Sequence, residues 1–372
     1  DINMVREDSE GRWAEFLSGV DHITDHTADW TYSPPQWLDE TKFRKGQCFG
    51  KDHLAGVLTC NLIMLLTFSR VSRLRKPMIF SGNTKTPLLA FKRVFKTTFI
   101  LLSWYDGNVW DKDHPSRKNL ELVKKLHRHY SDKTNQNKAE VDLLTVIHAV
   151  EDIPVSYGWQ QCPMGEMWCR EGETPYFSQF DMAMTQYTFC GLLLSHPEKF
   201  GIHGASREDM EAFVHFWRGI GYILGIEDKY NLCSGTYDTV LALCNAIETH
   251  YVRPAFVDID QDTMVAQKVI VDGMRMQDKV FSYEALMHYT SSHALGMNST
   301  KELRPKTFMD WVSFYIFYII FNILCRFQRF RERCNKSIRY KLKQTFYKED
   351  FASERSTFLF PLPKVKTKYV GL

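Results

Sequence analysis

No aspartate or glutamate occurs between His53 and Tyr105, although the whole chain of 372 residues is nearly balanced, with 47 basic and 44 acidic side chains. Lysine and arginine are frequent in this acid-free stretch, from Arg70 to Lys96. Cations without acids beside them in sequence must find anions elsewhere, such as the propionates of a cofactor, phosphates or lipid head groups. The alternative is a basic face that is merely solvated, and the sequence leaves both interpretations open.

Other absences exclude several classes of protein. The nine cysteines show no repeated short spacing, and Cys162 and Cys169 are too far apart for a zinc signature, so we expect reduced and mostly buried thiols. A net charge of +3 without a nucleic-acid-binding motif gives no reason to expect a nucleic-acid partner. No internal repeat occurs. The apolar run Leu54–Phe68 is shorter than the about twenty residues of a membrane span, which favours a buried helix.

Helical spacing of apolar residues dominates the middle of the chain. The composition, 44% hydrophobic and 24% charged, is that of a globular protein with a sizeable core. Apolar side chains recur at the helical period over residues 91–105, 117–130, 138–150, 177–195, 207–224 and 237–251. The sequence therefore predicts an all-α protein with an N-terminal extension over residues 1–50, a single mainly helical domain over 51–300 and a tail over 301–372.

The tail combines an apolar segment with a basic one. Residues 311–325 carry no charge and are rich in phenylalanine, tyrosine and isoleucine, and basic side chains follow from Arg326 to Lys343, opposed by Glu332. An aromatic, apolar segment that ends in a cationic cluster suits a membrane interface with anionic lipids. We therefore predict a membrane-associating helix within residues 308–343, interfacial or re-entrant; a true span and a buried core helix are the alternatives.

Two helical faces carry the candidate functional residues. Arg93, Lys96 and Thr97 stand at i, i+3 and i+4, so they project from one side of a helix. His127 lies on the inward, apolar stripe of a second helix, whereas His129 falls off that stripe and should be solvated. An inward histidine that faces an inward Arg/Lys/Thr cluster could hold a flat cofactor between the two helices.

These segments resemble the rubber oxygenase (latex clearing protein) family and its relatives, the fungal oxygenases of the endoplasmic reticulum that cleave a prenyl chain in mycophenolic acid synthesis. The resemblance rests on Thr86-Pro87 leading into Arg93-Val94-Phe95-Lys96-Thr97, on Val123-Lys124-Lys125-Leu126-His127, and on residues 216–226, which read Phe-Trp-Arg-Gly-Ile-Gly-Tyr-Ile-Leu-Gly-Ile. The order of the segments and the spacing from the arginine to the histidine match those of the family.

The resemblance implies an α-helical domain that binds haem b. By that resemblance His127 would be the proximal axial ligand of the iron, and Lys96 would lie on the distal side, where it could occupy the sixth position in a closed state. Arg93 and Thr97 would line the distal pocket. A neutral imidazole is a common iron ligand, and the polarity of the distal pocket controls whether O2 binds and is activated.

Further residues would complete this implied site. A ligand histidine normally has an acceptor on its other ring nitrogen. Thr185 and Asp181, four residues apart in an otherwise apolar helix, are the candidates for that acceptor. Arg218 could neutralise a haem propionate.

Each assignment has a structural alternative. His127 could be a hydrogen-bonded core residue, and Arg93 could pair with a buried carboxylate. Lys96 could extend its amino group to solvent. Asp181 could cap or bridge helices without any tie to the histidine, and Arg218 could form an ordinary salt bridge.

The sequence departs from the family at one catalytic position. Rubber oxygenases carry a glutamate shortly before the arginine, proposed as a base in cleavage, and Lys76-Pro77 stands in that place here. Either the reaction needs no base, or a carboxylate arrives from elsewhere, such as Glu151-Asp152 or Glu227-Asp228. The reaction could also differ while the haem site persists.

The resemblance thus predicts a haem-dependent oxygenase. Such an enzyme would use O2 to cleave a carbon–carbon double bond of an apolar, unsaturated lipid or isoprenoid substrate, giving carbonyl products. A membrane-associated protein suits a substrate dissolved in lipid, and the fungal relatives make the endoplasmic reticulum the candidate compartment. The alternatives are a haem- or lipid-binding protein without catalysis and a haem-dependent isomerase or dehydratase.

Overall fold

The regular structure of this chain is helical. The computed structural model describes residues 11–142, 173–257, 261–298 and 300–347. The main helices are α2 (Glu40–Asp52), α3 (Leu54–Phe68), α4 (Ser72–Phe80), α5 (Pro87–Asp106), α6 (Pro115–Gln136), α7 (Lys138–Asp142), α9 (Gln179–Ser195), α10 (Arg207–Ile223), α11 (Tyr237–Ile247), α12 (Gln261–Arg275), α13 (Tyr283–His288), α14 (Phe308–Asn322) and α15 (Gln328–Phe346).

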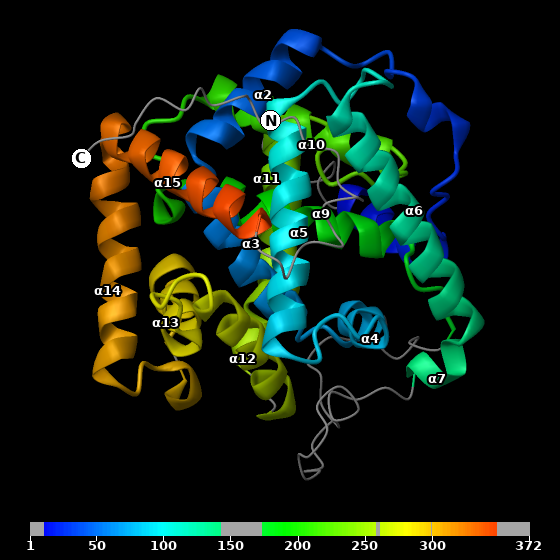
Figure 1. Ribbon diagram of the computed structural model, residues 1–372. Helices are drawn as coiled ribbons and strands as arrows, with labels where there is room; N and C mark the ends of the chain where they lie inside the picture. The colour runs from blue at the N-terminus through cyan, green and yellow to red at the C-terminus, as the bar shows by residue number, and fades with distance from the viewer. Residues whose placement is uncertain (1–10, 143–172, 258–260, 299, 348–372) are drawn as a thin grey trace.

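No β-sheet forms within these described ranges, where Ile23 and Ser178 make an isolated bridge. The predicted all-α class is therefore confirmed for this part of the chain. Figure 1 shows α5 in front at the centre, with α14 on one side of the molecule and α6 on the other. The predicted helix over 138–150 is described only as α7, because its remainder lies outside the described residues.

Local sequence explains where several helices begin. Pro87 opens α5 and Pro115 opens α6, each at a position where the helix needs no backbone N–H donor. Reciprocal capping boxes, in which a hydroxyl and a carboxylate each accept a backbone N–H, start three of the described helices. The pairs are Ser178 with Asp181 at α9, Ser206 with Asp209 at α10, and Thr307 with Asp310 at α14.

The core lies where α3, α5, α9 and α10 meet. The apolar run Leu54–Phe68 forms the largely buried helix α3, as predicted. Trp217 of α10 is fully buried, and its ring centre lies 6.4 Å from that of Tyr105 on α5 and 5.2 Å from that of Phe189 on α9. Aromatic rings at these separations pack edge to face or offset, so they join three helices at one point.

Helix α2 lies at the end of the predicted N-terminal extension, in a segment that is not among those where apolar spacing predicted a helix. Asp39 caps it by accepting the N–H of Lys42 at 3.0 Å. Gly46 brings α2 so close to α10 that an added Cβ would collide with the carbonyl oxygen of Ala212. The helix is thus stabilised by its fit against α10, which is not a local property of the sequence.

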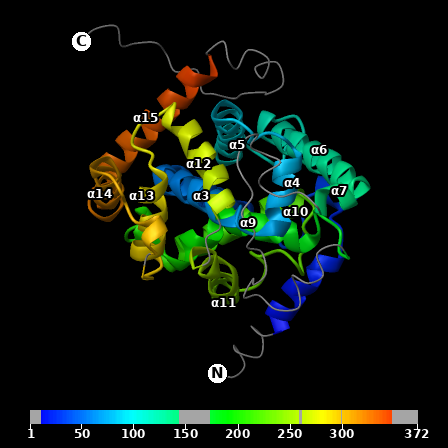
Figure 2. The same ribbon diagram turned by 90° about the horizontal axis from the view of Figure 1, so that it is seen from below.

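The C-terminal helices pack on the body of the protein. Arg339 of α15 forms an ion pair with Asp106 at 2.6 Å, and Asn335 donates to the carbonyl oxygen of Lys51 at 2.9 Å. Figures 1 and 2 both place α14 and α15 on one side of the molecule and α6 and α7 on the opposite side. The domain limits at residues 50 and 300 remain a prediction.

Candidate functional site

Helices α5 and α6 carry the predicted cofactor residues on their spread halves. The two helices are joined by residues 107–114, and Figure 1 shows them close together near this connection and apart toward Pro87 and Gln136. Arg93 lies in the second turn of α5, and His127 lies in the second half of α6. Helix α4 packs against α6 and lies between the spread ends of α5 and α6 in both views. The two residues therefore share the same end of the α5–α6 pair.

His127 is an imidazole without a partner on its inner nitrogen. Its Nδ1 is buried and has no hydrogen-bond partner among the described residues. Burial, assisted by the neighbouring His26, lowers the pKa of His127 to about 3, so the ring is neutral at physiological pH. The ring centre of His26 lies 5.4 Å away, and that of Phe177 lies 6.1 Å away. His129 is exposed, as predicted.

His26 is held beside His127 by the N-terminal segment. Its Nδ1 lies 3.3 Å from the carbonyl oxygen of Leu224, and a carbonyl accepts only from a protonated nitrogen. The Nε2 of His26 is then an unprotonated acceptor, and it too is buried without a partner. Burial lowers the pKa of His26 to about 4. The backbone N–H of Thr24 donates to Phe177 at 3.0 Å, which fixes this segment against the start of α9.

Arg93 also has an unsatisfied buried atom, as several other described residues do. Its Nη1 is buried and has no partner among the described residues. Burial lowers the pKa of Arg93 to about 10, partly offset by Tyr130, so the guanidinium stays charged at neutral pH. Thr97 is exposed and donates its hydroxyl to the Arg93 carbonyl oxygen at 3.1 Å, and Lys96 is half-buried. The alternative of a buried carboxylate partner for Arg93 is not found in the described residues.

The structure engages Asp181 and Thr185 elsewhere. Both carboxylate oxygens of Asp181 accept from the guanidinium of Arg73, at 2.6 and 2.9 Å, in a pair that is almost fully buried. Asp181 also caps α9, and the Thr185 hydroxyl donates to the Asp181 carbonyl oxygen at 2.8 Å. Neither is hydrogen-bonded to His127. These contacts match the structural alternative for Asp181, in which it caps and bridges helices and does not contact the histidine. The carboxylate neutralises the buried guanidinium of Arg73, which would otherwise lie unpaired in the protein interior.

The acid-free basic stretch is not simply a solvated face. Arg73, Arg75 and Lys76 of α4 are buried. Arg73 holds Asp181, and Arg75 donates to the Thr263 hydroxyl at 2.9 Å. Lys76, at the position where the resemblance predicts a glutamate, is among these buried side chains.

Arg218 forms an ordinary salt bridge, which was the structural alternative to binding a haem propionate. Its guanidinium donates to both carboxylate oxygens of Asp228, at 2.9 and 2.7 Å, and lies 4.0 Å from the ring centre of Trp37. The Asp228 carboxylate is therefore occupied. Glu151-Asp152, the other proposed source of a base, lies outside the described residues.

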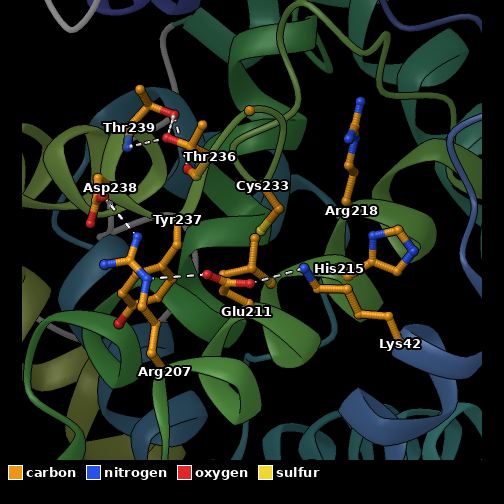
Figure 3. Close-up of a pocket in the computed structure, with 12 residues that line it drawn as sticks. Lys42, Arg207, Glu211, His215, Arg218, Cys233, Thr236, Tyr237, Asp238 and Thr239 are labelled. Atoms are coloured by element: carbon orange, nitrogen blue, oxygen red, sulfur yellow. Dashed lines mark hydrogen bonds and ion pairs between the residues drawn. The ribbon is translucent and has the colours of Figure 1, made fainter. Parts of the chain in front are cut away.

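Arg218 also lines a half-open cavity of about 720 Å³ where α10, the start of α11 and α2 meet. Figure 3 shows Glu211 between Arg207 and Lys42, and its carboxylate is 3.1 Å from a nitrogen of each. Asp238 lies 2.7 Å from Arg207. These cations are therefore neutralised by neighbouring acids. Neither His127 nor Arg93 lines this cavity, so it is separate from the predicted cofactor residues.

The wall of this cavity includes a buried thiol, Cys233, which lies 3.8 Å from the Sγ of Cys190. Burial raises the pKa of Cys190 well above its ordinary value. The cysteines that the structure describes are free and mostly buried, as predicted. Cys162 and Cys169 lie outside the described residues.

Sequence reasoning missed His26. The residue sits in a polar segment without helical periodicity, and it is separated from His127 by most of the N-terminal half of the chain. A histidine in such a segment carries no spacing signal that ties it to a ligand site. The contact exists because the N-terminal segment folds back across the start of α9.

Comparisons with known proteins give one solved structure. No model of a known family and no curated protein matches the sequence. A structure of the latex clearing protein in the closed state is similar over 87% of this chain and 82% of that chain, with 16% sequence identity and a TM-score of 0.46. The latex clearing protein is a protein of the family that the sequence resembles. At this identity a likeness concerns the arrangement of the helices and not the substrate, the cofactor or the reaction.

Proposed function

We propose that this chain binds haem b between α5 and α6, with His127 as the axial ligand, and that it acts as a haem-dependent oxygenase. The observation that carries the proposal is the pair of buried, unpartnered polar atoms on these helices, Nδ1 of His127 and Nη1 of Arg93. Buried polar groups are nearly always paired, so each orphan calls for a ligand or a water. The Nη1 of Arg93 requires a polar group of a ligand or a water, and the neutral imidazole of His127, at the same end of the α5–α6 pair, could bind the metal of the same ligand.

The chemistry of these side chains fits haem b. Iron binds a neutral imidazole, and burial keeps His127 neutral. The Nδ1 of His127 and the Nε2 of His26 are not hydrogen-bonded to each other in the structure. We propose that a small rotation of these neighbouring rings on haem binding lets His127 donate its Nδ1–H to the Nε2 of His26, which leaves the Nε2 lone pair of His127 for the metal. The desolvated charge of Arg93 would bind a polar or anionic group on the other wall, with Lys96 one turn further along α5.

Bound haem would supply O2 activation and cleavage of a carbon–carbon double bond to carbonyl products. The chain would position the reactants. Of the candidate bases, Asp228 has both oxygens held by Arg218, and Asp181, the carboxylate considered for His127, has both oxygens held by Arg73. We therefore propose a reaction that does not use either carboxylate as a base. The substrate class we propose is an apolar, unsaturated lipid or isoprenoid.

The proposal is tested with the purified full chain reconstituted with haem. We expect a Soret band in the oxidised and reduced spectra, and O2 uptake when squalene is added as an apolar polyprenyl probe. Carbonyl products would be trapped with a hydrazine reagent. Absence of a Soret band would overturn the haem assignment, and a normal band without O2 uptake on squalene or longer polyisoprenoids would overturn the oxygenase assignment.

A haem-binding protein without oxygenase activity is the second candidate function. The observation that favours it is the buried cation Lys76 in place of the family's glutamate. A haem-dependent isomerase or dehydratase would also keep the iron without consuming O2. Product analysis under nitrogen separates these two candidates, because an isomerase or dehydratase turns over without O2 and a binding protein does not.

We predict that His26 acts as the positioning residue of His127. His26→Leu removes the acceptor, and we expect haem affinity to fall by roughly 10–100-fold, as is typical when the hydrogen-bond partner of a ligand histidine is lost. The reduction potential should rise, because a less basic imidazole stabilises the ferric state less well. His26→Gln retains an acceptor and should restore both values in part. Equal potentials in wild type and His26→Leu would contradict the role, even if the affinity changed.

A further inference from the structure

We propose that the outer face of α14, together with the exposed cations of α15, docks this chain onto an anionic lipid bilayer, with α14 lying in the plane of the membrane surface. The proposal does not rest on haem binding. It concerns two surfaces, defined here as the apolar stripe of α14 and the basic stripe of α15. Each is argued from its own exposed side chains.

The apolar stripe consists of large side chains that the body of the protein leaves uncovered. They recur along one side of α14 and its continuation: Phe308, Met309, Trp311, Tyr315, Ile316, Ile319, Ile323 and Phe327. The helical stretch Phe308–Arg326 is long and apolar enough to cross a membrane, yet only 22% of it is buried within the described protein. A core helix of a soluble protein would be mostly buried, so the core-helix alternative does not describe α14.

Contacts along the inner side of α14 favour an in-plane helix over a span. Near its start Asp310 accepts from the Ser282 hydroxyl at 2.6 Å. Near its end Asn322 bonds to His293 at 2.9 Å, and His203 donates to the Phe321 carbonyl oxygen at 2.6 Å. A spanning α14 would break these bonds or draw their polar partners into hydrocarbon, which is costly. A helix held along its whole length can instead bury its outer face at the interface.

The basic stripe supplies charge complementarity. Arg329, Arg333 and Lys336 stand at i, i+4 and i+7 on α15, and all are exposed. Arg339 and Lys341, by contrast, pair with Asp106 and Asp278 of the body, both at 2.6 Å. The cationic cluster of the tail is thus divided: some cations hold α15 in place and the others face solvent. Cations that follow an apolar, aromatic stripe suit anionic lipid head groups.

This arrangement anchors the protein without bringing α6 to the lipid. Figures 1 and 2 place α14 and α15 on the side of the molecule opposite α6 and α7. The α14 face would therefore hold the protein at the membrane surface. A substrate would reach His127 from another side of the molecule. Binding to membranes and binding of haem should be separable by mutation.

The test uses the purified full chain and vesicle sedimentation. We expect binding to vesicles of equimolar phosphatidylcholine and phosphatidylserine, and weaker binding to phosphatidylcholine alone or at high salt. The variant Tyr315→Ser/Ile319→Ser/Ile323→Ser should lower the partition coefficient by about ten-fold or more, since it removes exposed apolar area without touching the core. The control Val257→Ser/Met276→Ser changes apolar residues that are at least as exposed but lie elsewhere, and should bind as wild type.

A second variant tests the basic stripe. Arg329→Gln/Arg333→Gln/Lys336→Gln should lose the preference for phosphatidylserine and keep the weaker binding to phosphatidylcholine. Trp311 reports orientation: bromine placed shallow in the acyl chains should quench its fluorescence more than bromine placed at the bilayer centre, with Trp311→Phe as the blank. Stronger quenching from the centre would overturn the in-plane geometry.

The remaining outcomes are decisive. The proposal is overturned if the wild-type chain binds neither kind of vesicle. It is also overturned if the Tyr315/Ile319/Ile323 variant binds vesicles as strongly as wild type. A dimer that this variant dissociates, without vesicle binding by wild type, would assign the stripe to a second copy of the chain. His127→Ala should bind vesicles normally, and the stripe variants should keep any Soret band, so failure here is distinguishable from failure of the proposed function.

Discussion

His127→Ala should abolish the Soret band of the haem-reconstituted protein. The substitution removes the nitrogen proposed as the axial ligand of the iron on α6, so haem would lose its coordination to this helix. The loss of haem affinity should exceed the roughly 10–100-fold expected for loss of the outer partner His26. Absorption spectra and haem titration of the purified variants measure this directly.

The control for this experiment lies two residues away on the same helix. His129 is exposed, so His129→Ala changes an imidazole of α6 without entering the site. We expect its spectrum and haem affinity to equal those of wild type. Far-ultraviolet circular dichroism should show both variants folded. A Soret band of normal height and position in His127→Ala would remove this residue as the ligand, whatever the behaviour of the control.

Asp181→Ala should destabilise the fold by about 3–5 kcal/mol, because it leaves the guanidinium of Arg73 buried without its counter-charge. The two side chains are only 8% and 5% exposed, and the pair is closed by two hydrogen bonds. The same substitution removes one half of the capping box of α9. Urea unfolding followed by circular dichroism gives the free energy of unfolding.

An exposed ion pair provides the matched control. Asp238 pairs with Arg207 at 2.7 Å, and both side chains are 57% exposed. Asp238→Ala should lower the free energy of unfolding far less than Asp181→Ala does, since solvent screens exposed pairs. If Asp181→Ala and Asp238→Ala proved equally mild, the buried pair would not be a structural element. Under conditions where Asp181→Ala is folded, its haem spectrum should match wild type, since Asp181 is bonded to Arg73 and not to His127.

The helices were predictable because their signals are local. Apolar spacing placed α5, α6, α9, α10 and α11, and prolines and capping residues fix several of their starts within a few residues. These features depend on neighbours within one or two turns. Helix α2 escaped prediction because its stability comes from the contact of Gly46 with α10, far away in sequence.

The partners of the site residues could not be predicted in the same way. Asp181 was one of two candidate partners of His127, and the structure pairs it with Arg73 instead, while Arg218 has Asp228 as its partner. Which carboxylate meets which cation depends on how helices cross, and several pairings satisfy the same sequence. The latex clearing protein resemblance named residue types and their order along the chain. It could not name His26, which lies outside the segments that carry the resemblance.

The sequence by itself determined the all-α class, the buried helix Leu54–Phe68, the inward face of His127 and the amphipathic character of the tail. All of these follow from periodicity and composition over short windows. Only the tertiary structure decided which polar atoms are left without partners, that His26 stands beside His127, and that α14 keeps one face bonded to the body and the other bare. The physical reason is that burial and pairing are properties of surfaces brought together from distant segments, and no single segment contains them.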